Sequence, residues 1–290
     1  WSALVLVTQP FWFGGAQYAN LDMLVAGCIS AAIVLAAHAA LAREAGQGHR
    51  LALWGAYAMA GLGLLAKGLI GLVLPGAVIV AWLLLTGRWR AILGLLSLPG
   101  LIVLALVAAP WFVAMQRLYP DFFHYFFIYQ HFQRFTQTGF NNMHAWWYYL
   151  PLMVGLTLPW VPAWLLTVWG PKPSAGLGDQ TAATDAPAAS SRAALRWLAW
   201  IWMVVILVFF SIPASKLPGY ILPALPPLAY LVADTLTRRW PSAQAWAPKA
   251  WGTVAALMCL ILIGAAVKYD EQSSRPVLPV LQPLIKQGVP

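Results

Sequence analysis

Long apolar runs separated by short polar segments make up most of the chain. A helix that crosses a membrane needs about 20 predominantly apolar residues. By this measure the pattern predicts spans over residues 23–42, 51–66, 69–87, 91–113, 145–170, 197–213, 219–236 and 250–267. We therefore expect an all-α fold, a polytopic bundle of transmembrane helices. Because the chain starts at Trp1 and not at a methionine, we also expect it to be an internal part of a longer protein.

One segment between two spans, residues 114–144, is rich in His, Arg, Tyr, Phe and Trp. Polar groups beside aromatic anchors at a membrane surface suit a charged, lipid-linked substrate. We expect this segment to form loops and short helices on the outer face of the bundle. Residues 1–170 then form an N-terminal helix group that carries it. Residues 171–196, which begin with a run rich in Pro, Ala, Gly, Ser and Thr, form a flexible cytoplasmic linker. Residues 197–290 form a C-terminal helix group with an outer tail.

The composition agrees with a membrane protein, since 61% of the residues are hydrophobic and 9% are charged. A soluble domain carries about 25% charged residues. The formal net charge is +9, but the basic residues are scattered over short loops and form no basic stripe. A nucleic-acid partner is therefore not expected. Cys28 and Cys259 lie inside apolar runs, where a cysteine is usually an inert small hydrophobe.

Basic residues concentrate in alternate loops, which predicts the orientation of the helices. The richer set of loops contains Arg43, Arg50, Arg88, Arg90, Lys172, Arg192, Arg196, Arg238, Arg239 and Lys249. Cytoplasmic loops collect Lys and Arg, so we assign this set to the cytoplasm. The opposite, periplasmic or lumenal, face then holds Asp22, Lys67, Lys216 and residues 114–144.

Asp22 and Lys67 are candidate site residues because each lies at the edge of a span. An acid at a membrane boundary is often functional, although an aspartate at a helix start can simply be an N-cap. Lysine is a good point charge for phosphate, and Gly68 allows a tight turn after Lys67. The alternative for Lys67 is a side chain that snorkels to the membrane edge.

Two further pairs could bind an anion or a metal. Lys216 and Tyr220 flank a Pro-Gly turn, so an ammonium and a hydroxyl could converge on one anion. The alternative is a snorkelling lysine beside an aromatic-belt tyrosine. His131 and Arg134 are three residues apart and would share one face of a helix. Arginine can hold phosphate, whereas His131 could be a metal ligand or an ordinary surface residue.

Several short motifs follow one another along the chain. They are Asn20-Leu-Asp-Met23, Ala66-Lys-Gly68, Gln130-His-Phe-Gln-Arg-Phe135, Trp147-Tyr-Tyr149, Leu158-Pro-Trp160 and Ser215-Lys-Leu-Pro-Gly-Tyr-Ile-Leu-Pro223. In this order the set resembles the GT-C superfamily of polytopic glycosyltransferases. Within that superfamily it is most similar to the branch of protein O-mannosyltransferases and bacterial lipid A 4-amino-4-deoxyarabinose transferases.

The resemblance implies an inverting glycosyltransferase that takes a sugar from a polyprenyl-phosphate donor. The acceptor would be a lipid, with lipid A as a candidate, or a protein. The enzyme would span the bacterial inner membrane, among its lipids, with its active site facing the periplasm. The family's main catalytic aspartate would lie upstream of Trp1, and Asp22 matches its second acidic position.

The resemblance also assigns roles to individual residues. Positions that surround the donor phosphate match Lys67, Arg134, Lys216 and Tyr220. His131 matches a position that joins a metal site in some members, so a divalent metal is a candidate cofactor. The family often has a glutamate before this histidine; Gln130 stands there instead, which weakens the expectation of a metal.

Two other functions fit parts of the same pattern. A flippase for lipid-linked saccharides would also carry cations and aromatic residues near the membrane face. Transporters place ionisable groups near the bilayer midplane, and the predicted spans contain almost none, which favours the enzyme. A non-catalytic membrane assembly subunit is the other alternative, and its outer polar residues would tolerate substitution.

Overall fold

The computed structural model describes residues 1–17, 20–127, 142–169, 186–240 and 242–272 of the chain. Two compact units are present, unit 1 (Trp1–Pro241) and unit 2 (Ser242–Pro290). Unit 2 contributes one helix, α13 (Ala243–Gln272). Unit 1 contains all the other described elements and all the residues of the candidate site that the structure describes.

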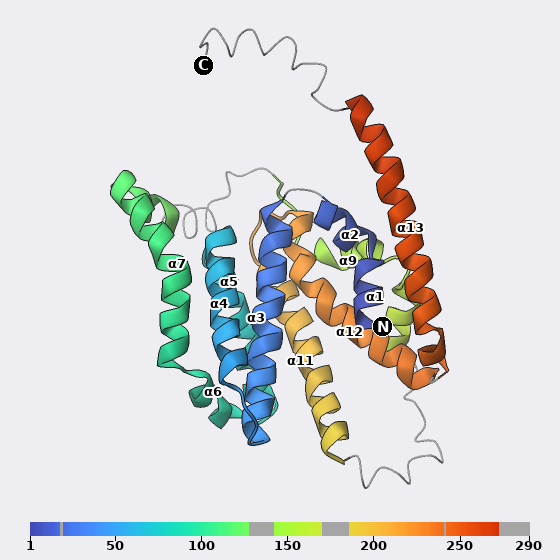
Figure 1. The fold of residues 1–290 in the computed structure, drawn as a ribbon, viewed down its shortest axis with the longest axis horizontal. Coiled ribbons are helices and arrows are strands. Elements are labelled where there is room, and N and C mark those ends of the chain that lie inside the picture. The colour runs from blue at the N-terminus through green and yellow to red at the C-terminus, as the bar shows by residue number, and fades with distance from the viewer. Residues whose placement is uncertain (18–19, 128–141, 170–185, 241, 273–290) are drawn as a thin grey trace. The chain divides into compact units, whose positions relative to one another are not determined.

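The described part of unit 1 is helical, which confirms the predicted all-α fold (Figure 1). Its elements are α1 (Ser2–Val7), α2 (Pro10–Gln17), α3 (Leu21–Glu44), α4 (Arg50–Lys67), α5 (Ile70–Leu85), α6 (Trp89–Leu95), α7 (Leu98–Leu118), α9 (Tyr149–Leu156), α10 (Val161–Trp169), α11 (Ala186–Ser211), the 3₁₀ helix η3 (Pro218–Ala224) and α12 (Leu225–Arg239). Three stretches among the described residues are long and apolar enough to cross a membrane: Leu21–Glu44, Leu98–Leu118 and Ser191–Ser211. The chain is a polytopic helical membrane protein.

Some of the predicted spans are not continuous helices. The span predicted over 145–170 is divided into α9 and α10, with Pro159 in the break. The span predicted over 91–113 divides into α6 and α7 at Ser97, whose side chain accepts a hydrogen bond from the Gly100 N–H at 3.2 Å. A proline lacks the N–H that an α-helix needs, and a serine cap starts a new helix. Hydropathy alone does not report either interruption.

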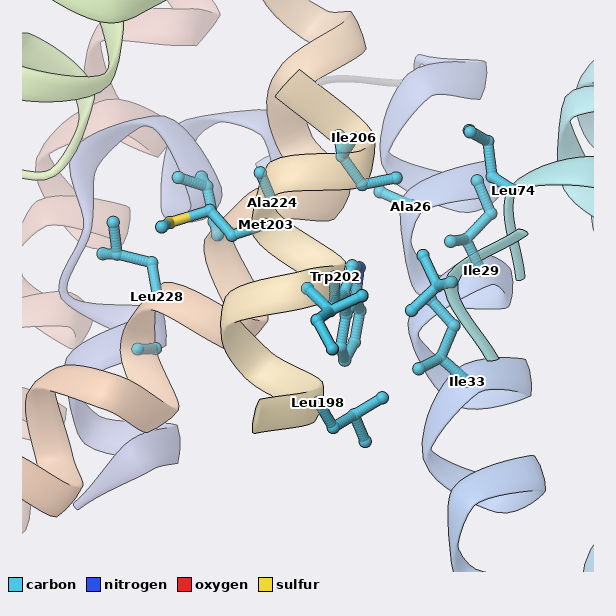
Figure 2. Packing of buried hydrophobic residues seen from close by; sticks show 14 of the residues in the cluster. Ala26, Ile29, Ile33, Leu74, Leu198, Trp202, Met203, Ile206, Ala224 and Leu228 are labelled. Carbon is cyan, nitrogen blue, oxygen red and sulfur yellow. The ribbon is translucent and has the colours of Figure 1, made fainter. Parts of the chain in front are cut away.

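The centre of unit 1 is an apolar core shared by α3, α5, α11, η3 and α12. Figure 2 shows Trp202 on α11 beside side chains of α3, among them Ile29 and Ile33. On α11, Met203 and Ile206 are also fully or almost fully buried in this core. Lipid tails are as apolar as these side chains, so close van der Waals packing stabilises the core more than transfer out of water does.

The turn from α4 to α5 brings two glycines into backbone contact. Gly68 adopts a φ of +79°, a conformation that favours glycine. Gly63 and Gly71 then face each other so closely that a Cβ on Gly71 would lie 2.6 Å from the Gly63 Cα and closer still to the Gly63 carbonyl. The contact lies within one helical hairpin, α4–α5, and fixes how closely its two helices pack.

We expect Gly71→Ala to destabilise the protein by about 1–3 kcal/mol or more, because the methyl group would meet rigid backbone and force the two helices apart. Thermal unfolding in detergent measures this effect. Gly76→Ala is the matched control, since it lies on the same helix and its Cβ would have no atom within 4 Å. Equal unfolding temperatures for the two variants would contradict the close contact.

Charged residues pair near the ends of several helices, and their assignment to two membrane faces stays a prediction. Glu44, the last residue of α3, pairs with Arg88 at 3.0 Å, and the buried Asp234 of α12 pairs with Arg196 and with Arg238. Lys67 pairs with Asp22 where α4 ends and α3 begins. Asp22 and Glu44 lie at opposite ends of α3, and α4 runs back so that its last residue, Lys67, reaches Asp22.

The division of the chain into two helix groups with a linker between them stays a prediction. Residues 170–185 lie outside the described residues, and α11 begins at Ala186, inside the range predicted for the linker. Helices from both sides of that range, α5 and α11, pack on each other within unit 1.

Candidate functional site

Asp22 is the second residue of α3, and its environment is set by the start of that helix. The Asn20 side chain accepts a hydrogen bond from the Asp22 N–H at 2.7 Å and is the N-cap. Asp22 itself is therefore not the cap. Only 8% of the Asp22 surface is exposed. Its carboxylate lies in the first turn of α3, where the helix dipole stabilises a negative charge. The side chain remains available for another partner.

That partner is Lys67, the last residue of α4. The Lys67 ammonium forms an ion pair with the Asp22 carboxylate. It also lies 4.3 Å from the centroid of the Tyr220 ring, a cation–π geometry. The structure thus brings together three residues that are far apart in the sequence: an acid, a cation and a phenol.

Tyr220 belongs to η3, which leads from the end of α11 into α12. Its ring packs against Phe210 of α11, with 5.3 Å between the ring centroids. A narrow pocket at this place is lined by Asp22, Val25, Ile29, Lys67, Ile70, Phe210, Gly219, Tyr220 and Pro223. A larger and mostly apolar pocket is lined by Phe11, Gly14, Gly15, Asn20, Met23, Pro218, Gly219 and Leu222. Gly219 belongs to both linings, so the polar cluster borders on apolar space.

Lys216 has a different environment. The residue is 2% exposed, and its ammonium donates hydrogen bonds to the carbonyl oxygens of His144, at 3.0 Å, and of Pro213. Burial lowers the pKa of this ammonium. Lys216 lines neither pocket. In this structure it fastens two loop segments together, and its predicted contact with a donor phosphate stays a prediction.

The loop segments that Lys216 joins are also connected by their backbones. Met143 and Ser215 form an antiparallel bridge, and the Lys216 N–H donates to the Asn142 carbonyl at 3.0 Å. The Tyr149 hydroxyl donates to the Leu217 carbonyl at 3.1 Å. The end of the predicted outer segment is therefore attached to the turn that carries Tyr220.

Two of the predicted site residues, Arg134 and His131, lie outside the described residues, so their roles stay predictions. Within the described ranges no group of three or more His, Cys, Asp or Glu residues could hold a metal ion. Gly219, in contrast, is a site residue that sequence reasoning missed. The Pro-Gly pair predicts a turn but carries no signal of a contact with Asp22.

Comparison with known proteins finds relatives over most of the chain. The undecaprenyl phosphate-alpha-4-amino-4-deoxy-L-arabinose arabinosyl transferase of Erwinia tasmaniensis is 32% identical over 272 residues, which cover 90% of this chain and 45% of that protein. The protein of the same name from an Enterobacter species is 30% identical over 97% of this chain and 49% of its own length. No protein-family model matches the chain.

A solved structure agrees with these relatives. The crystal structure of ArnT from Cupriavidus metallidurans bound to undecaprenyl phosphate superposes with a TM-score of 0.62 and 30% identity, over 96% of this chain and 45% of that one. Over most of its length the chain is similar to these arabinosyl transferases and to ArnT. The expected resemblance to GT-C glycosyltransferases is thereby confirmed. The chain spans about half the length of the curated relatives it matches.

Proposed function

We propose that the protein containing this chain is an inverting glycosyltransferase of the bacterial inner membrane. It moves a sugar from a polyprenyl-phosphate donor to an acceptor on the periplasmic face. The names of the relatives favour undecaprenyl phosphate as the carrier and 4-amino-4-deoxy-L-arabinose as the sugar. Lipid A is the acceptor that the family resemblance favours.

The cluster of Asp22, Lys67 and Tyr220 is the observation that carries this proposal. A lysine and a phenol at a membrane boundary, beside apolar space, suit a phosphate that is attached to a hydrocarbon chain. Asp22 holds the ammonium in place before the donor arrives. A donor phosphate then competes with Asp22 for the same cation.

The reaction follows from these roles. The acceptor oxygen attacks the anomeric carbon from the face opposite the phosphate, and its proton passes to a general base, the catalytic aspartate expected upstream of Trp1. The bond between the anomeric carbon and the phosphate oxygen breaks, and the electron pair stays on the phosphate. Lys67 and Tyr220 stabilise the charge that develops there. Arg134 and Lys216 are proposed to assist at the same phosphate.

A transporter of the same lipid-linked sugar is less well supported. Ionisable groups of transporters lie near the bilayer midplane. The acidic residues, lysines and arginines of α3, α4 and α7 lie in the terminal turns of these helices. This placement suits chemistry at the membrane surface.

Reconstitution of the complete protein in liposomes separates the two functions. With a labelled undecaprenyl-phosphate sugar and lipid A, a transferase releases undecaprenyl phosphate and moves the label to the acceptor. A transporter moves the intact donor to the other leaflet and leaves the sugar on its carrier. Translocation without any transfer of label would overturn the proposal.

A further inference from the structure

Gly219, the second residue of η3, lies directly against the Asp22 side chain. A Cβ added to Gly219 would lie 2.8 Å from the Asp22 Cγ, 3.1 Å from its Cβ and closer still to its Oδ2. All three of the nearest atoms belong to Asp22. The backbone at Gly219 therefore covers one oxygen of the carboxylate, and a side chain of any kind would overlap with it.

The other oxygen of the same carboxylate, Oδ1, forms the ion pair with Lys67. An aspartate side chain has only two rotatable bonds, so pushing Oδ2 aside also moves Oδ1. The next residue, Tyr220, presents its ring to the same ammonium. The turn at residues 219–220 thus contacts Asp22 and supplies Tyr220, two groups that lie against the Lys67 ammonium.

We propose that Gly219 is a positioning residue of the transfer site. It holds the Asp22 carboxylate in the position where it pairs with the Lys67 ammonium. The expected effect on turnover rests on the proposed function, whereas the contact between Gly219 and Asp22 does not depend on it. Gly219 acts through Asp22 and Lys67 and need not touch the substrate. Only a glycine lets the η3 backbone come this close to the acid.

The effect of replacing a glycine by alanine on the stability of the fold depends on which atoms the new methyl group would meet. At Gly71 a methyl group would meet the backbone of Gly63, which cannot move without separating two helices. At Gly219 the three nearest atoms all belong to the short side chain of Asp22. Asp22 can rotate away, so Gly219→Ala is expected to leave the fold intact and to disturb the ion pair.

The first test is the turnover of Gly219→Ala in the complete protein. We expect turnover to fall by about 10²-fold, since displacement of a catalytic group by about 1 Å has effects of this size. Gly27→Ala is the matched control, because it lies on the same helix as Asp22 and its Cβ would have no atom within 4 Å. Wild-type turnover in Gly219→Ala would overturn the proposal.

The second test is a double-mutant cycle that needs no transferase activity. Asp22→Ala removes Oδ2 and Cγ, the two nearest of the three atoms that an alanine at 219 would meet, and leaves the Asp22 Cβ at 3.1 Å. We expect Gly219→Ala to lower the unfolding temperature when Asp22 is present and to change it little in the Asp22→Ala background. Equal shifts in both backgrounds would overturn the proposal, as would failure of Gly219→Ala to fold. If the wild type transfers no sugar, the proposed function fails while the cycle still tests the contact.

Discussion

Replacing Lys67 by methionine is expected to lower turnover by about 10²–10³-fold, the effect of removing one preorganised group that stabilises developing charge. Methionine keeps an unbranched apolar stem but removes the ammonium. The ammonium lies next to Asp22 and Tyr220, where we propose that the leaving phosphate is bound. Steady-state transfer of labelled sugar by the purified complete protein measures this effect.

The same substitution also leaves the Asp22 carboxylate without its ion-pair partner, at a side-chain exposure of 10%. An uncompensated, mostly buried charge destabilises a protein. The double variant Asp22→Asn/Lys67→Met is therefore the matched control. We expect it to recover the unfolding temperature but not the turnover. Recovery of turnover in the double variant would contradict a role for the cation in catalysis.

Lys216→Met is expected to lower the unfolding temperature markedly. It would remove the hydrogen bonds that the ammonium donates to the carbonyls of His144 and Pro213, and a hydrogen bond from a charged group contributes about 1.5–3 kcal/mol. Differential scanning fluorimetry against Lys249→Met, a change at an exposed lysine, measures the effect. An unchanged unfolding temperature would contradict the role of Lys216 in joining the two loops.

The same variant tests the phosphate role that the family resemblance implies for Lys216. Turnover per folded molecule, at a temperature below the transition, separates the two roles. A lower turnover of the folded fraction supports a contact with the donor phosphate. Turnover equal to that of wild type assigns Lys216 to the loop connection alone.

The sequence was sufficient to predict the helical membrane fold and to single out Asp22, Lys67 and Tyr220 as candidate site residues, but it did not predict the ion pair between Asp22 and Lys67. The positive-inside rule depends only on loop composition, and it gathers Asp22, Lys67 and Lys216 on one predicted face. The order of the short motifs adds Tyr220. The structure brings three of these four residues, Asp22, Lys67 and Tyr220, into contact.

Features that depend on three-dimensional proximity could not be read from the sequence. The contact between Gly219 and Asp22 joins residues of η3 and α3, and no local pattern at either residue indicates the other. The position of the Lys216 ammonium depends on the bridge between Met143 and Ser215. A window of apolar residues also cannot show that a helix is interrupted within it, as between α9 and α10.

Binding of undecaprenyl phosphate to the purified complete protein tests the central claim most directly. A ligand that binds only the folded state raises the unfolding temperature in a concentration-dependent way. We predict such a rise for the wild type and a much smaller one for Asp22→Asn/Lys67→Met, which keeps its fold but lacks the cation. An equal rise in both proteins would contradict the assignment of Lys67 to the donor phosphate.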